Sequence, residues 1–375
     1  MKAKPSLGLM VVMLMFPQIV ETIYSPALGS IAQAFSVSYA QAAQTLSIYF
    51  GAFALGVAVW GILADQWGRR PTMLLGLLIY AASAFTAMYT DSFTVLMLAR
   101  ACSAFGIAVG SVVTQTMLRD CFTGAELGKV FSLMGLGISI SPVIGMFSGG
   151  QLAQLGGHAA VFLALFFLAL ALLFYNFVKL PETQQSKHPL ALGALSRRMV
   201  KDAHIWRSAF LVALYNIALF SYYQLGAFAF ATLGYSAEQF GYSGLVLGLG
   251  SLLGSYVNKS LLAKNMSQQS LLKAASLLLT LGAIAVYALQ ASIWFVAPML
   301  LVVMAFGIAI PNVLSMALPQ YKTQAGSAGA LFGLMYYLLI GAGLAIAALV
   351  GHLGWVLITC GCATVLLTLS GKTKG

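Results

Sequence analysis

The chain has 375 residues, of which 61% are apolar and only 7% are charged, whereas about 25% of the residues in an average soluble protein are charged. A soluble globule of this length could not cover so much apolar surface with so few charges, so the composition excludes an ordinary soluble enzyme. The net charge of +11 fits either a nucleic-acid-binding protein or a membrane protein with basic loops, and the positions of the charges must decide.

Long apolar runs follow one another along the whole chain. Because a spanning helix needs about 20 apolar residues, the sequence predicts an all-α membrane protein with twelve transmembrane helices. The strands of a membrane β-barrel would instead alternate over short segments. We place the helices at residues 7–34, 40–64, 72–90, 94–119, 128–154, 159–180, 206–232, 239–263, 270–289, 292–318, 326–350 and 353–371.

One long polar connection divides the predicted helices into six and six. It runs from Pro181 to Ile205 and carries four basic residues. We therefore expect an N-terminal six-helix bundle at residues 1–180, a cytosolic linker with a short amphipathic helix at 181–205, and a C-terminal six-helix bundle at 206–375.

The basic residues obey a single orientation. If the N-terminus is cytosolic, every Lys and Arg except Arg100 falls at the cytosolic side of a predicted helix. This is the positive-inside bias, and it explains the net charge without nucleic acid. We expect a multi-pass protein with both termini in the cytoplasm.

The two halves resemble repeats. A shift of 193 residues aligns three residues of the second helix, Gly51, Gly61 and Asp65, with Gly244, Gly254 and Asn258. Parallel repeats about an axis along the membrane normal are one of the known transporter architectures.

The connection between the second and third helices combines charge with tight turns. It reads Gly61-Ile-Leu-Ala-Asp65-Gln-Trp-Gly68-Arg69-Arg70-Pro71, in which the acid can pair with either arginine or face a helix N-terminus. A charged turn that only obeys the positive-inside rule is the alternative. The segment closely resembles the loop motif of the major facilitator superfamily, which implies that Gly61, Asp65, Gly68, Arg69 and Arg70 stabilise the outward-facing state.

Two further helices sharpen this resemblance. The fourth carries Arg100 within Leu98–Gly106 and ends in Met117-Leu-Arg119-Asp120, and the fifth carries Gly137-Ile-Ser-Ile-Ser141-Pro142-Val-Ile-Gly145. The first segment resembles the helix 4 motif of the superfamily, the second resembles the Bcr/CflA drug-resistance group, and the third resembles the motif of drug:proton antiporters. The resemblance implies the major facilitator fold, multidrug efflux, antibiotic resistance and the bacterial inner membrane.

Glu21 is the one acid of eight that the sequence places at membrane depth. Because an ionised group costs about 2.5 to 3.5 kcal/mol at the bilayer centre, we expect it to face a cavity and to carry the coupling proton. Helix spacing brings Arg100 within reach of Glu21, so the two can pair in one state and separate in another. A neutral, hydrogen-bonded Glu21 and a snorkelling or carbonyl-bound Arg100 are the structural alternatives.

Helical spacing also suggests the walls of a substrate cavity. Residues that share a helix face are Gln18, Glu21 and Tyr24, then Ser111 and Gln115, then Asn216, Phe220 and Tyr223, with Asn312 and Tyr336 or Tyr337 joining from later helices. Simple helix packing is the alternative for each aromatic residue. Aromatic walls with one acid suit amphipathic or weakly cationic molecules.

The fifth helix is expected to act as a pivot. Gly137, Gly145, Gly149 and Gly150 should pack against the other half, and Pro142 interrupts the helix. Plain packing glycines are the alternative.

The sequence therefore predicts a proton-coupled exporter that works by alternating access on small organic molecules. Its expected partners are substrate, protons and the lipid bilayer, it is expected to be a monomer, and no metal or cofactor is expected because the proton gradient drives it. A dedicated exporter of one metabolite or siderophore stays open as an alternative, and uptake by symport is disfavoured by the fifth helix. A membrane enzyme or receptor is remote, because no span carries a zinc pair, a catalytic dyad or a nucleotide loop.

Overall fold

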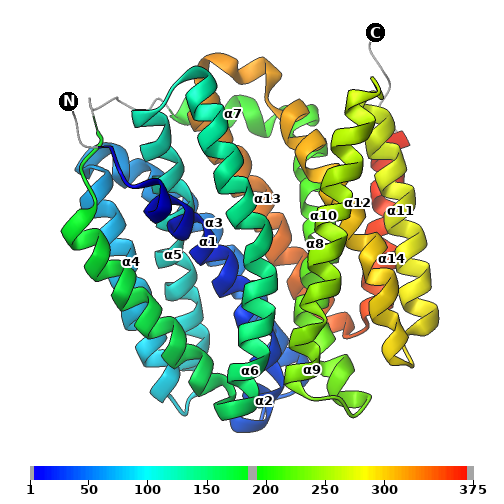
Figure 1. The fold of residues 1–375 in the computed structure, drawn as a ribbon. Coiled ribbons are helices and arrows are strands. Elements are labelled where there is room, and N and C mark those ends of the chain that lie inside the picture. Colours follow the sequence, from blue (N-terminus) through cyan, green and yellow to red (C-terminus); the bar gives the residue numbers. More distant parts are fainter. Residues whose placement is uncertain (1–3, 185–191, 370–375) are drawn as a thin grey trace.

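The computed structural model describes residues 4–184 and 192–369, which form helices joined by short turns (Figure 1). The elements in chain order are α1 (Leu7–Ile23), η1 (Ser25–Ala27), α2 (Leu28–Ala34), α3 (Tyr39–Trp67), α4 (Arg69–Tyr89), α5 (Phe93–Cys121), α6 (Gly124–Lys179), α7 (Leu192–Val200), α8 (Ala203–Thr232), α9 (Ala237–Tyr242), α10 (Gly244–Ala263), α11 (Gln268–Leu289), η2 (Ile293–Phe295), α12 (Val296–Ala317), η3 (Pro319–Gln324), α13 (Ala325–Val350) and α14 (Leu353–Leu369).

The described residues make twelve apolar passes. Ten segments are long and apolar enough to cross a membrane. One of them, α6, bends at Gly156 and Gly157, so its two arms count separately, and the shorter apolar helix α14 adds another. The predicted fold class, an all-α membrane protein of two six-helix bundles, is confirmed.

Four predicted helices differ in detail from the observed ones. Helices 128–154 and 159–180 are the two arms of α6, joined through Gly157, whose φ of +62° suits glycine. The first helix breaks after Ile23 into η1, where Pro26 lacks the N–H that a continuous helix would need. Helix 239–263 breaks at Ser243 into α9 and α10. Residues 370 and 371 of the last prediction lie outside the described residues.

The second pass of each half begins in the same way. Ser38 accepts from the backbone N–H of Gln41, whose side chain accepts from the Ser38 N–H, and Ser236 and Gln239 form the same capping box. This shared start supports the repeat relation between the halves.

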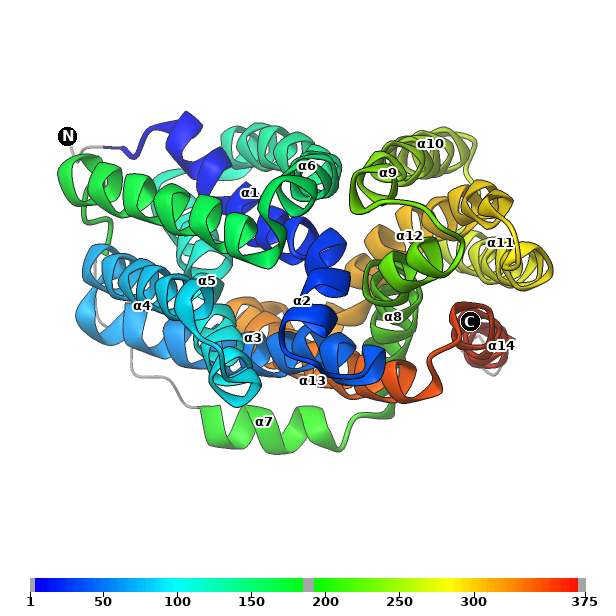
Figure 2. The same cartoon turned by 90° about the horizontal axis from the view of Figure 1, so that it is seen from below.

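The halves meet along two seams, which the view in Figure 2 separates. In one seam α3 packs against α13, and in the other α6 packs against α9 and α10. The predicted linker contains α7, as expected for a short helix there, while its residues 185–191 lie outside the described part.

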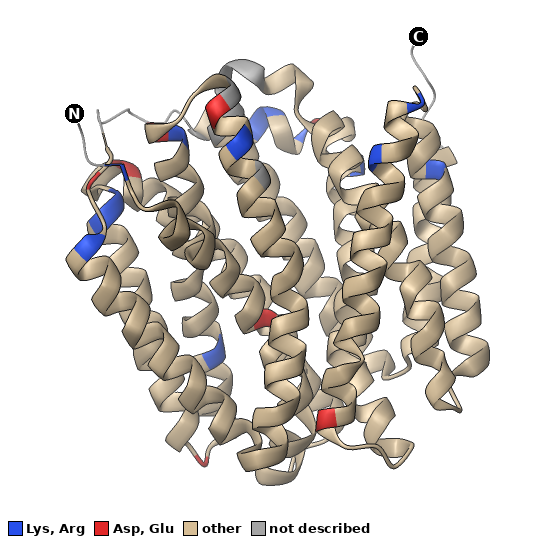
Figure 3. Ribbon diagram, viewed as in Figure 1, with Lys and Arg blue, Asp and Glu red and all other residues tan. Residues whose placement is uncertain are grey.

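The basic residues gather at one face. Figure 3 shows most of the Lys and Arg residues at the face where α1 begins and α14 ends. We call this the basic face, and the face that carries α2 and α9 the opposite face.

Candidate functional site

Glu21 lies in the last turn of α1 and is buried in protein. Its side chain is 4% exposed, so it does not face lipid, and its Oε1 atom has no hydrogen-bond partner among the described residues. Buried polar atoms without partners are uncommon and mark a strained or functional group. An unpaired carboxyl therefore lies at membrane depth, where the sequence predicts it.

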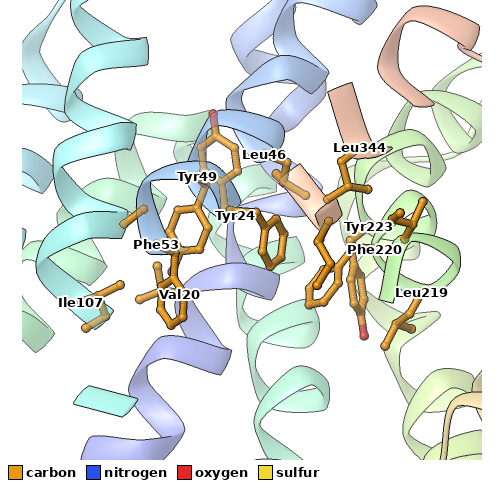
Figure 4. Packing of buried hydrophobic residues seen from close by; sticks show 14 of the residues in the cluster. Val20, Tyr24, Leu46, Tyr49, Phe53, Ile107, Leu219, Phe220, Tyr223 and Leu344 are labelled. Carbon is orange, nitrogen blue, oxygen red and sulfur yellow. The ribbon is translucent and has the colours of Figure 1, made fainter. Parts of the chain in front are cut away.

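Arg100 of α5 is held by aromatic rings. Its guanidinium carbon lies 3.9 Å from the ring centre of Tyr24 and 4.7 Å from that of Tyr49, and the residue is 1% exposed. Figure 4 shows these two tyrosines side by side. The Nε and Nη2 atoms have no hydrogen-bond partner within the described ranges. Cation–π attraction therefore holds a buried cation that has unused donors.

Glu21 and Arg100 do not form an ion pair in this structure. None of the ion pairs within 4.0 Å among the described residues joins them, although the charge of Arg100 acts on the Glu21 carboxyl. The two groups are therefore unpaired with one another here, and their pairing in another state stays a prediction.

A wall of tyrosines stands around the carboxyl. Tyr49, Tyr223, Tyr336 and Tyr337 all lie within electrostatic reach of Glu21. They come from α3, α8 and α13, so both halves of the chain contribute. Glu21 thus lies where the halves meet.

A cavity of ≈ 450 Å³ lies between α3, α5 and α13. It extends from Asp65 and Arg119, near the basic face, to Tyr336 and Tyr337. Of the predicted site residues it is lined by Gly61, Asp65, Ser111, Gln115, Arg119 and Tyr336. Glu21 is not a lining residue, contrary to the expectation that it faces a cavity directly. Tyr336 and Tyr337 both line the cavity and lie within electrostatic reach of Glu21.

The remaining predicted wall residues lie outside this cavity. Phe220 packs on Phe50 of the first half, with ring centres 4.5 Å apart, and on Tyr223 at 5.5 Å (Figure 4). Tyr24 is fully buried and donates to Thr45 Oγ1 at 2.9 Å. These three aromatic residues act as packing at the junction of the halves.

Three of the predicted amide residues, Asn312, Asn216 and Gln18, do not line the cavity. Asn312 Nδ2 donates to Asn258 Oδ1 and to the Ile308 carbonyl, both at 2.7 Å. Asn216 Nδ2 donates to the Val212 carbonyl in its own helix at 2.8 Å. Gln18 is half-buried, and its backbone carbonyl accepts a hydrogen bond from the Thr22 hydroxyl. A role of these residues in binding substrate stays a prediction.

The charged turn between α3 and α4 forms an ionic cluster. Arg69 Nη1 lies 2.6 Å from Asp65 Oδ1, and Arg69 Nε lies 3.0 Å from Asp120 Oδ2. Gly68 makes the turn with a φ of +106°, which glycine tolerates. Of the two predicted partners of Asp65, the structure selects Arg69. All of these contacts lie within the first half, and their role in the outward-facing state stays a prediction.

Sequence reasoning missed the acid that completes this cluster. Glu182 accepts from the backbone N–H groups of Arg69 and Arg70, each at 3.0 Å, and Thr183 Oγ1 donates to Asp120 at 3.0 Å. Partial burial raises the pKa of Glu182, but these and other backbone N–H bonds outweigh it, so the pKa lies below its usual range. In the sequence, Glu182 is recognisable only as an acid just after an apolar helix. The first N–H groups of α4, which have no partner within the helix, are what it binds in the structure.

The glycines of α6 do not pack as predicted. A Cβ at Gly145 or Gly149 would meet Thr22 or the Ile23 carbonyl of α1, and one at Gly137 would meet Val11 and Met15, also of α1. Only Gly150 faces the second half, against Gly241. The prediction that this set packs against the other half is wrong for Gly137, Gly145 and Gly149, because they lie on the side of α6 that faces α1, next to Glu21.

The halves are joined tightly towards the opposite face. Gln224 Nε2 donates to the Ala43 carbonyl at 2.9 Å and to Ser47 Oγ at 3.1 Å. Tyr39 and Phe228 stack at 4.4 Å, and Gln151 Nε2 donates to Glu238 at 2.9 Å. These contacts join the halves at the opposite face, whereas the cavity of ≈ 450 Å³ reaches Asp65 and Arg119 near the basic face.

The chain is similar in sequence to known membrane transporters. A sequence profile described as Major Facilitator Superfamily matches residues 10–348. An "Uncharacterized transporter" of Rickettsia bellii is 30% identical over 86% of this chain and 84% of its own. The "Bicyclomycin resistance protein homolog" of Haemophilus influenzae is 25% identical over 85% and 82%. The "Multidrug resistance protein D" of Escherichia coli is 29% identical over 48% and 46%.

Solved structures share the fold at low identity. A D-xylose-proton symporter superposes with a TM-score of 0.75 at 16% identity, covering 97% of this chain and 95% of that one. A bacterial homologue of the lysosomal transporter Spinster gives 0.73 at 15% identity with the same coverage. At such identities these structures support the fold alone.

Proposed function

Because the chain belongs to the major facilitator superfamily and is a membrane transporter rather than an enzyme, we propose that it is a proton-coupled exporter of small amphipathic or weakly cationic organic molecules. It is a multidrug:proton antiporter that works by alternating access. We place it as a monomer in a bacterial inner membrane, with the basic face and both termini in the cytoplasm, as the positive-inside bias favours.

One observation carries the proposal: the buried carboxyl of Glu21 lacks a partner at the junction of the halves. A buried carboxyl holds its proton more tightly than one in water, and an approaching cation promotes release. Arg100, which has unused donors beside Tyr24 and Tyr49, is the cation that can approach. Small relative shifts of these two residues therefore switch Glu21 between proton uptake and proton release.

The contacts between the halves at the opposite face and the cavity towards the basic face then describe the inward-facing state. Cargo enters between α3, α5 and α13 and reaches Tyr336 and Tyr337. Because these tyrosines also lie within reach of Glu21, cargo that moves them opens the path to the carboxyl. Through this contact, binding of cargo and retention of the proton on Glu21 exclude one another.

The proton gradient sets a limit on this work. One proton that enters through 100 mV supplies about 2.3 kcal/mol, and one pH unit adds about 1.4 kcal/mol. Together they support a gradient of about 500-fold for a neutral cargo. If a monovalent cation leaves for each proton, no net charge moves and only the pH term is left, about tenfold.

The proposal is tested by transport with purified protein in liposomes under an imposed pH gradient, with ethidium as the amphipathic monocation. We expect wild type to concentrate ethidium against its gradient and Glu21→Gln to lose this activity. Asp91→Asn, which neutralises an exposed acid, is the matched control and should transport as wild type does. If Glu21→Gln still concentrates ethidium at the expense of the pH gradient, the coupling role of Glu21 is wrong.

The relatives named for drug resistance support multidrug cargo. A panel of neutral and monocationic amphipaths separates this cargo from a single metabolite. We expect several unrelated members to compete with ethidium, each at micromolar to millimolar concentration, and a transporter dedicated to one metabolite would ignore them all.

A further inference from the structure

A second hollow, which shares no lining residue with the cavity, lies between α4 and the second arm of α6. The second arm of α6 runs beside α4 (Figures 1 and 2), and the groove between them has a volume of ≈ 590 Å³. Its walls include Leu74 and Leu78 of α4 and Leu170, Phe174 and Phe177 of α6. Every lining residue is Leu or Phe, so the hollow accepts a hydrocarbon chain.

Arg70 stands at the basic-face end of this groove. It shares a face of α4 with Leu74 and Leu78, at intervals of four residues. Its guanidinium carbon lies 5.8 Å from the ring centre of Phe177, and Nη2 donates to the Phe177 carbonyl at 2.6 Å. The charged end of Arg70 is thus fixed over one wall of the groove.

The charge of Arg70 is not neutralised by the protein. None of the ion pairs in the described ranges includes it, and its Nε atom is buried without a hydrogen-bond partner. The nearest acid of the cluster, Glu182, accepts from backbone N–H groups instead. The side chain as a whole is only half-buried, so an anion can approach the guanidinium from outside and form a charge-assisted hydrogen bond with it.

The dimensions match half a bilayer. Leu78 lies eight residues after Arg70, which is about 12 Å along a helix. The hydrocarbon core of one leaflet is about 15 Å thick. A molecule with an anionic group at Arg70 and an apolar chain in the groove would therefore span the leaflet next to the basic face.

We propose that this groove binds one anionic phospholipid, with its phosphate at Arg70 and an acyl chain along Leu74 and Leu78. Charge decides against the cationic cargo of the proposed function, because Arg70 repels it. The bound phosphate holds the start of α4, and with it the neighbouring Arg69, beside Asp65 and Asp120. Lipid composition therefore acts on the ionic cluster through Arg70.

The test uses purified, delipidated full-length protein in detergent, titrated separately with dioleoylphosphatidylglycerol and dioleoylphosphatidylethanolamine. Retained lipid is counted by native mass spectrometry. We expect one phosphatidylglycerol to bind saturably and phosphatidylethanolamine to bind more weakly. Arg70→Gln should lower the phosphatidylglycerol affinity about tenfold, the size expected for a lost charge-assisted hydrogen bond.

Three further variants distinguish lipid binding in the groove from general electrostatic attraction of anionic lipid to the basic face. Leu78→Trp, which fills the groove, should lower the affinity, whereas Leu249→Trp on the exposed side of α10 should not. Lys129→Gln, which removes an exposed cation of α6, should leave the affinity unchanged.

Equal binding of both lipids, an unchanged affinity in Arg70→Gln, or an equal loss in Lys129→Gln would each overturn the proposal. Because the measurement counts bound lipid, its failure would leave the proposed transport function standing.

Discussion

The corner between α3 and α4 and the corner between α10 and α12 hold matching residues of the two halves in different chemistry. In the first, Asp65, Arg69 and Asp120 form two ion pairs. In the second, Asn258, which aligns with Asp65, accepts a neutral hydrogen bond from Asn312. The repeat keeps the position of the polar group, while among the described residues ion pairs are present only in the first corner.

The same division holds at membrane depth. Glu21 and Arg100 both belong to the first half. The described acids of the second half, Asp202 and Glu238, lie at helix starts. We infer that the first half carries the proton and the charge-dependent switch, and that the second half supplies aromatic walls and neutral packing.

The largest effect is expected from Arg100→Ala. Removing this cation takes away the positive charge that acts on the Glu21 carboxyl and that we propose promotes proton release. We expect gradient-driven transport to fall at least about 100-fold with normal expression, while Arg100→Lys keeps part of it. Unchanged export by Arg100→Ala would return Arg100 to a structural role and remove the proton site from the first half.

Smaller effects are expected from substitutions at the two corners. The comparison predicts that the ionic corner loses more stability than the neutral one. Arg69→Ala leaves two carboxylates without their cation, so the protein should lose about 3 kcal/mol of stability. Asn258→Ala leaves the Asn312 amide short of one acceptor, at about 1 to 2 kcal/mol.

Thermal unfolding of both variants in the same detergent measures this order. Only Arg69→Ala should also change the salt dependence of unfolding. Equal losses with equal salt dependence would contradict the assignment of the ionic switch to the first corner.

The smallest effect is expected from Glu182→Gln, and it should depend on pH. Because backbone N–H groups hold the pKa of Glu182 below its usual range, the carboxylate adds stability above the pKa of the unfolded chain, about 4.3. That stability is lost as the pH falls through the lower pKa of the folded state. We expect wild type to be slightly more stable than the variant at pH 7 and the difference to shrink in acid. A difference that grows in acid would mean that Glu182 does not act as a carboxylate.

Local patterns in the sequence predicted part of the fold and of this site. Apolar runs predicted the passes, and the charged turn predicted that Asp65 could pair with Arg69 or Arg70, of which the structure has Arg69. The position of Glu21 in an apolar run predicted its membrane depth, but not that it lies outside the lining of the cavity.

Contacts between distant helices could not be predicted in this way. Helical spacing tells which residues share a face, but the rotation of each helix decides which neighbour that face meets. For this reason the glycines of α6 meet α1, Asn312 meets Asn258, and Tyr49 holds Arg100. Glu182 was missed because its partners are backbone N–H groups, which carry no sequence signal.

The most direct test of the account counts the protons that Glu21 releases when cargo binds. Purified protein in weakly buffered detergent solution is mixed with ethidium while a pH indicator is followed. We predict that wild type releases close to one proton for each ethidium bound, and that Glu21→Gln binds ethidium without releasing any. Equal proton release from both proteins would contradict the claim that Glu21 is the proton carrier.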